Sequence, residues 1–160
     1  MAPLVDLRLY SFPIVLVRLA LGLAGLAVAR ALGVSAAPSL RLFGLGAFLF
    51  ALAMLTSRRR RLFWLRAEDA LPIDAAAPVA SWPWTTARAM FPSTLAVTAL
   101  TALALPLNPS LAALLSGVLA GMATVGSVFA VELVLWERSR HVRLLATTGM
   151  KTELYVRPAA

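Results

Sequence analysis

The 160-residue sequence contains no cysteine and only one histidine, His141. Without cysteine, the chain cannot form disulfides, thiolate metal sites or dithiol redox pairs. A single histidine also excludes bis-histidine haem ligation and a histidine metal cluster within one chain. The seven acidic residues show no metal-binding spacing, and no nucleophile–base pair or glycine-rich phosphate loop is present. We therefore expect no metal site, no cofactor and no catalytic residues, and an enzyme is the less favoured interpretation.

Charged residues are scarce. They make up 14% of the chain, whereas soluble domains carry about 25%. Hydrophobic residues make up 61%, and the mean hydropathy is +0.85. One small core cannot bury this much apolar surface, so we expect lipid to cover much of it. The net charge of +8 comes from fourteen arginines and one lysine, which in an apolar chain usually flank membrane spans. Nucleic-acid binding would not explain the apolar runs, and we set it aside.

Four apolar runs approach the roughly 20 residues that a transmembrane helix needs. They are Phe12–Val34, Leu40–Thr56, Phe91–Leu107 and Leu111–Trp136. Short turns containing proline join them in pairs. The sequence thus predicts an all-α membrane protein with four transmembrane helices in two tandem hairpins, forming a single domain over residues 1–160. Its parts are hairpin 12–56, loop 57–90, hairpin 91–136 and tail 137–160.

Short sequence echoes occur at matching points of the two hairpins. Pro-Ser-Leu occurs at residues 38–40 and again at 109–111, and the pattern S-R-x-x-R-L occurs at 57–62 and 139–144. These echoes fit a tandem duplication, in which the two hairpins would be related by an axis along the membrane normal. Chance is an equally good explanation in a chain rich in alanine, leucine and arginine.

The basic residues predict the orientation. Six arginines lie in the loop 57–90, and four arginines and the lysine lie in the tail 137–160, whereas the two short turns carry no charge. Because basic loops stay in the cytoplasm, we expect the loop and both termini on the cytoplasmic side. The expected location is a bacterial inner membrane.

Glu132 lies inside the fourth apolar run, where an ionisable side chain is costly and usually faces protein or water. At about 100° per residue, Gly117 and Gly121 share its face of the helix. Their G-x-x-x-G spacing lets two helices approach closely. Glu132 is therefore expected to face another helix and not lipid.

Arg18 in the first run follows the same pattern. It shares a helix face with Gly22 and Gly25, and both charges lie roughly 8–9 Å from the expected inner boundary. We predict that the first and fourth helices pack along these faces, with Arg18 and Glu132 as a buried charge pair. The favoured interpretation is structural: either the charge pair holds the two helices together, or the Arg18 side chain extends to the inner headgroups. The alternative is that Glu132 is a proton- or cation-coupling site.

The central loop begins with a basic run: Arg58, Arg59, Arg60, Arg61 and, after four apolar residues, Arg66. As a short interfacial helix, this segment would place its arginines among anionic lipid headgroups. A plain topogenic stop signal is the simpler interpretation. The same arginines could instead contact a phosphate-bearing lipid.

The tail is less apolar than the runs before it. Residues 147–149, Thr-Thr-Gly, predict a turn, and Lys151–Val156 alternates enough to form a strand. An isolated hairpin is marginal in water. An ordered tail would therefore pack on the central loop or on a partner.

Three functions follow from these observations. The first choice is an accessory or assembly subunit of a larger membrane complex, because the chain offers membrane anchors and little polar lining. The second is a small oligomeric transporter or channel that uses Glu132. The third is a protein that handles anionic lipids through Arg58–Arg61. The expected partners are membrane lipids with anionic headgroups, together with further copies of the chain or other subunits.

Overall fold

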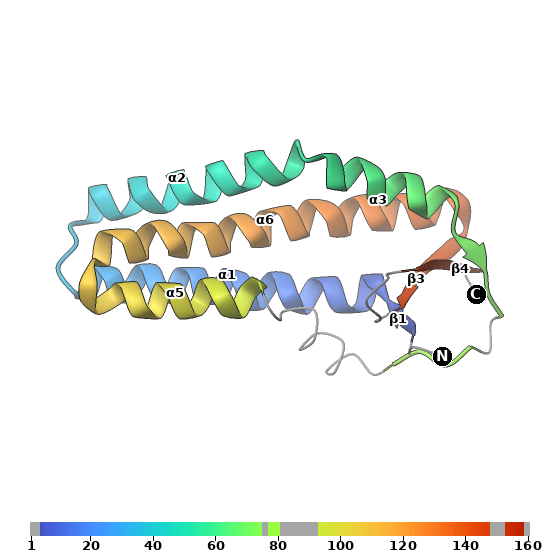
Figure 1. Cartoon of the computed structure of the whole chain (residues 1–160), viewed down its shortest axis with the longest axis horizontal. Coiled ribbons are helices and arrows are strands. Elements are labelled where there is room, and N and C mark those ends of the chain that lie inside the picture. The colour runs from blue at the N-terminus through green and yellow to red at the C-terminus, as the bar shows by residue number, and fades with distance from the viewer. Residues whose placement is uncertain (1–3, 75–76, 81–92, 148–152, 159–160) are drawn as a thin grey trace.

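The computed structural model describes residues 4–74, 77–80, 93–147 and 153–158. Four helices, α1, α2, α5 and α6, lie side by side in an elongated bundle (Figure 1). A further helix, α3, and a small sheet lie at one end. The helices are α1 (Leu7–Ala31), α2 (Ala36–Leu55), α3 (Arg58–Glu68), α5 (Ser93–Leu107) and α6 (Pro109–Arg140). The strands are β1 (Leu4–Asp6), β2 (Leu71–Pro72), β3 (Val142–Thr147) and β4 (Leu154–Pro158).

Polar residues at the helix ends explain where α1 and α6 begin. The side chain of Asp6 accepts the backbone N–H of Arg8 at 2.9 Å, which caps α1. Asn108 accepts the N–H of Leu111 at 3.1 Å, and proline occupies the first turn of α6. The turn after α1 uses Gly33 at φ +101°, a left-handed conformation that glycine adopts without strain.

Helix α6 is the centre of the bundle. It contacts α1, α2 and α5, whereas these three helices contact one another much less. Near the α1–α2 turn, Leu26, Ala29 and Ala113 are buried together. Most buried residues of α6 are small, among them Ala112, Ser116 and Gly117, so neighbouring backbones approach closely and dispersion forces hold the helices together.

Three helices, α1, α2 and α6, are long and apolar enough to cross a membrane. Large apolar side chains such as Phe12, Phe48 and Leu103 are more than 60% exposed on the bundle surface, as expected where lipid is the solvent. The third predicted span, Phe91–Leu107, differs from these three helices. Helix α5 has 15 residues and is about 22 Å long, less than the roughly 30 Å of a bilayer core. Residues 91–92 of that predicted span lie outside the described residues.

The prediction of an all-α fold is incomplete, because a four-stranded mixed sheet lies at one end of the bundle. Its order is β1-β3-β4-β2, with β1–β3 and β3–β4 antiparallel and β2–β4 parallel. The predicted strand in the tail corresponds to β4, although its first residues and residues 148–149 of the predicted turn lie outside the described part. Because β4 pairs with β2 of the central loop, the expected packing of the tail on that loop is confirmed.

A second apolar core joins α3, the sheet and the end of α6. Leu133, Leu144 and Leu154 are buried in it, and aromatic rings from α3 and α6 pack around them. Helix α6 has 32 residues, about 48 Å, so it is long enough to cross a bilayer and still join this core.

The predicted helix in the central loop is confirmed as α3. Figure 1 shows that α3 follows α2 after a short break and runs beside the last turns of α6. The break lies at Ser57, which has extended backbone. The S-R-x-x-R-L echo takes different structures at its two positions, because it opens α3 in one hairpin and spans the end of α6 and the start of β3 in the other. This echo therefore does not support a structural repeat.

Candidate binding site bordered by arginines

Glu132 points from α6 toward α3, where Arg60 and Trp64 bind its carboxylate. Arg60 donates from Nη2 to Oε1 and from Nε to Oε2, the latter over 3.2 Å. The indole N–H of Trp64 donates to Oε2 over 3.3 Å. Arg60 also donates from Nη1 to the backbone carbonyl of Leu55 at the end of α2, over 3.2 Å. This two-pronged, charge-assisted contact fixes α3 against both α2 and α6.

The predicted Arg18–Glu132 pair is wrong, because Glu132 takes its cation from α3 and not from α1. Arg18 donates its Nε–H to the hydroxyl of Thr94 on α5 over 2.8 Å. The Glu132 side chain is 27% exposed and lies against α3.

The register of α1 against α6 explains the error. A Cβ on Gly126 would lie 2.9 Å from a methyl group of Val15, so these two residues are level in the antiparallel helix pair. Arg18 is then level with about residue 123, nine positions from Glu132 and about 13 Å along the axis. The depth estimate assumed that both helices end at one level. In fact α6 extends past the start of α1 to join the sheet.

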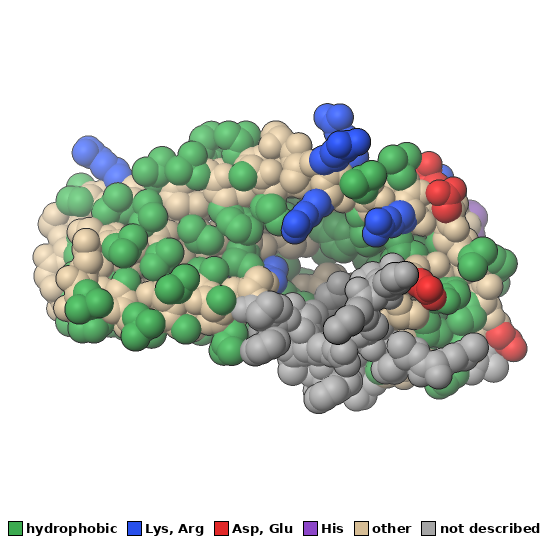
Figure 2. Space-filling view, viewed as in Figure 1, with side chains coloured by type: hydrophobic (Ala, Val, Ile, Leu, Met, Phe, Trp, Pro, Cys, Tyr) green, Lys and Arg blue, Asp and Glu red, His purple; other side chains and the backbone are tan. Residues whose placement is uncertain are grey.

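A cavity of about 700 Å³ lies between the helices beside these residues. Figure 2 shows the hollow, with Lys and Arg side chains around it and hydrophobic side chains over the bundle. The apolar lining comes from all five helices and consists of Ile14, Val15, Phe50, Met54, Leu55, Phe63, Ala96, Val97, Met122, Val125 and Phe129, with Gly126 between them. The volume lies in the range of 300–1,000 Å³ typical of small-molecule sites.

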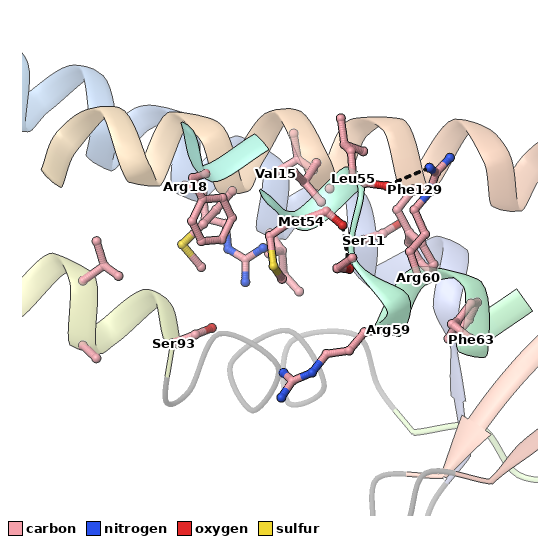
Figure 3. A pocket seen from close by; sticks show the side chains of 18 residues that line it. Ser11, Val15, Arg18, Met54, Leu55, Arg59, Arg60, Phe63, Ser93 and Phe129 are labelled. Carbon is pink, nitrogen blue, oxygen red and sulfur yellow. Dashed lines mark hydrogen bonds between the residues drawn. The ribbon is translucent and has the colours of Figure 1, made fainter. Parts of the chain in front are cut away.

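The polar lining of the cavity is cationic. It consists of Arg18, Arg59 and Arg60 and of Ser11, Ser57 and Ser93, and the described lining includes no acidic residue or histidine. In Figure 3, Arg18 reaches into the cavity from α1, while Arg59 and Arg60 come from α3 on its other side. Such a site can bind an anion at the guanidinium groups and an apolar group against its walls. The described lining offers no carboxylate or imidazole for proton transfer.

The basic run of α3 does not act as one surface. Arg59 and Arg60 line the large cavity, and Arg59 and Arg66 line a smaller hollow that Leu154 of the sheet completes. Arg58 and Arg61 are exposed and line neither cavity. Helical periodicity explains this division, because four consecutive residues point in four directions.

The four predicted packing glycines all lie at close helix contacts, but on two different interfaces. A Cβ on Gly22 would lie 2.8 Å from the Ser116 carbonyl of α6, and a Cβ on Gly25 would overlap the Ser116 side chain. Gly22 and Gly25 therefore lie at a close contact between α1 and α6. Gly117 and Gly121 pack against α2, at Phe43 and Ala47, so their predicted contact with α1 is wrong. The sequence reasoning missed Gly46, which meets Leu114 from the α2 side.

Two further residues were missed. Thr94 binds Arg18, and the only signal was a hydroxyl near the start of an apolar helix. The second is Glu137, which is 4% exposed although it carries a carboxylate. Its carboxylate accepts the backbone N–H of Leu144 over 2.9 Å and lies 3.7 Å from Arg143. It therefore connects the end of α6 to β3.

Comparison of the chain with protein-family models, with curated proteins and with solved structures gives no match. The chemistry of the cavity is therefore the basis for the functional proposal.

Proposed function

We propose that this protein binds an anionic lipid, with the headgroup at Arg18, Arg59 and Arg60 and an acyl chain along the apolar walls of the cavity. The observation that carries the proposal is this cavity of about 700 Å³, whose lining combines apolar walls from five helices with three arginines. Arg60 is neutralised by Glu132. Arg59 makes no hydrogen bond or ion pair with the described part of the chain, so the site retains positive charge.

The two halves of such a ligand match two kinds of lining. Guanidinium groups bind phosphate and carboxylate oxygens through paired N–H donors. Each methylene group moved from water into apolar surroundings contributes about 0.8 kcal/mol. A lipid already in the bilayer lacks that gain, so the arginines provide its selectivity, and the cavity shape provides its fit.

The membrane placement is part of the same proposal. We place α1, α2 and α6 across the bilayer, let the short α5 enter it as the fourth helix, and put the end that carries α3 in the cytoplasm of a bacterial cell. Two observations support this orientation. The basic run of α3 lies at one end of the bundle, and β1 and β4, the strands nearest the two termini, lie at that same end (Figure 1). Basic segments favour the cytoplasmic side.

Lipid binding replaces the accessory-subunit interpretation as first choice, because the cavity is a specific feature and no described surface identifies a partner. Assembly with other copies or subunits is a separate question, which the mass of the protein in a native membrane extract answers. The transporter interpretation is less favoured because Glu132 binds Arg60 and Trp64 and does not line the cavity.

The test is lipid retention. The protein is purified in mild detergent, and the lipids that remain bound are identified by mass spectrometry. We expect anionic lipids to be enriched over their share in the membrane. Arg59→Gln should reduce that enrichment, because it removes one positive charge from the cavity lining. The Arg59 side chain is exposed, so its replacement leaves the described contacts intact.

Arg41→Gln is the matched control. Arg41 is an exposed residue of α2 outside the cavity lining, so its replacement removes one positive charge without changing the site. Equal loss of anionic lipid in both variants would mean that overall charge, and not the cavity, attracts the lipid. Retention in the same proportions as the bulk membrane would overturn the proposal.

A further inference from the structure

Arg60 takes part in two structures at once. Its side chain lines the cavity, and its Nε and Nη2 groups bind the Glu132 carboxylate. The third donor to the carboxylate is the indole N–H of Trp64, which donates to Oε2 over 3.3 Å. Glu132 therefore acts as an anion that the protein itself supplies to one of the three arginines of the site.

Arg59 is in a different state. It contacts no described acidic group and is exposed beside the cavity. A headgroup that enters the cavity meets Arg59 directly, but it reaches Arg60 only by competing with Glu132.

This competition sets a requirement on the headgroup. A lipid carboxylate carries one negative charge and two acceptor oxygens, like Glu132, so exchanging one for the other gains nothing. A phosphomonoester carries about −1.5 to −2 charges at neutral pH and three strong acceptor oxygens. Two phosphate oxygens can accept from Arg60 while the third accepts from a second guanidinium. A carboxylate has only two oxygens, and both are used when it binds Arg60.

We infer that the ligand is a lipid with a phosphomonoester headgroup, which displaces Glu132 from Arg60. This inference rests on the proposed lipid binding at the cavity. Glu132 is then an internal competitor. When the ligand binds, the carboxylate keeps the Trp64 N–H and loses the guanidinium, and the contact between α3 and α6 weakens.

The inference predicts opposite effects for the two partners of the ion pair. Glu132→Gln removes the competing charge, so Arg60 becomes available to every anionic headgroup. Affinity should then rise about tenfold for phosphomonoester and carboxylate lipids alike. The double variant Arg60→Gln/Glu132→Gln loses the guanidinium without leaving an unpaired carboxylate. It should bind the phosphomonoester lipid at least about tenfold more weakly than Glu132→Gln does.

The experiment is native mass spectrometry of the full chain in micelles with three probes of matched acyl chains: phosphatidic acid, phosphatidylglycerol and a free fatty acid. The wild type should retain phosphatidic acid most strongly. An excess of inorganic phosphate should not displace it, because the acyl chains confine the lipid to the micelle around the protein, whereas a free ion has no such confinement. Displacement by phosphate would overturn the assignment to a lipid in favour of a soluble phosphate compound.

The remaining outcomes separate the two proposals. If no probe is retained by the wild type or by Glu132→Gln above the level of Arg59→Gln, the proposed function fails, and this inference fails with it. If lipids bind but Glu132→Gln leaves the affinity unchanged or lowers it, lipid binding stands and the competitor role of Glu132 is overturned. Equal retention of all three probes by the wild type overturns the phosphomonoester class.

Discussion

Gly117→Ala is expected to weaken the contact between α2 and α6. A Cβ at this position would overlap the backbone carbonyl of Phe43, and a backbone group cannot rotate away as a side chain can. Inserting a methyl group into a packed contact typically costs about 1–3 kcal/mol. Alanine also favours a helix by up to about 1 kcal/mol over glycine, which partly offsets this cost.

Gly44→Ala separates these two effects. Gly44 also lies in a long helix, α2, but a Cβ there would meet no atom within 4 Å. Any gain in helix propensity is common to both variants, so their difference in stability reports the packing cost alone. We expect Gly117→Ala to be less stable than Gly44→Ala by about 1–3 kcal/mol.

The measurement is reversible unfolding in mixed micelles, followed by circular dichroism. For a chain of this size, a difference of 1 kcal/mol corresponds to about 2–4 °C in the melting temperature. If Gly117→Ala and Gly44→Ala unfold together, the close approach of α2 and α6 at Gly117 is refuted. The explanation of the bundle by small-residue contacts would then be wrong at its central helix.

Other predictions concern the core that joins α6 to the sheet. Leu133→Ala should lower the stability by about 2–5 kcal/mol, because Leu133 is fully buried, whereas Leu135→Ala, at a side chain that is 60% exposed, should change it little; similar melting temperatures would contradict this burial. Glu137→Ala should lower the free energy of unfolding by about 1–3 kcal/mol, because it leaves the Leu144 N–H unpaired. Glu137→Gln should recover part of that loss, because its amide oxygen can still accept, and equal melting temperatures for the two variants would refute the contribution of this hydrogen bond. Asn108→Ala should reduce the free energy of unfolding by about 1 kcal/mol, because the α6 cap is lost. Asn108→Asp should keep most of the wild-type stability in the same thermal assay, because its carboxylate can still accept.

Patterns within one helix were predictable from the sequence. Apolar runs located α1, α2 and α6, and helix phase placed Gly22 and Gly25 at a close contact with α6. The basic run and its apolar neighbours also indicated α3. These features depend on periodicity and residue size, which act over a few turns and do not depend on how the helices are arranged.

The arrangement itself was harder to predict. Gly117 packs on α2 because α6 is the central helix and has several contact faces, and sequence spacing does not say which neighbour each face meets. Glu132 binds Arg60 because α3 turns back along α6, which the central loop alone did not show. The sheet has a similar origin. Its strands β1, β2, β3 and β4 come from three distant parts of the chain. The tail pattern predicted only β4, and β1 and β2, with three and two residues, are too short to be recognised without their partners.

The cavity could not be predicted from any single segment, because five helices supply its walls. The arginine run was noticed as a possible lipid contact, but only Arg59 and Arg60 of its first four members line the large cavity. Arg18 was predicted to pair with Glu132, but the register of α1 against α6 places it at the cavity instead. The site therefore emerges from tertiary packing, although each of its charges was visible in the sequence.

Photo-crosslinking tests the lipid proposal most directly. Phosphatidic acid with a diazirine in its acyl chain is added at low ratio to the protein in nanodiscs, and labelled residues are mapped by mass spectrometry. The cavity account predicts labels on Val97 and Met122, which line the cavity, and weaker labelling of both in Arg59→Gln. Labels confined to outward-facing residues such as Leu49 and Leu103, unchanged in that variant, would contradict it.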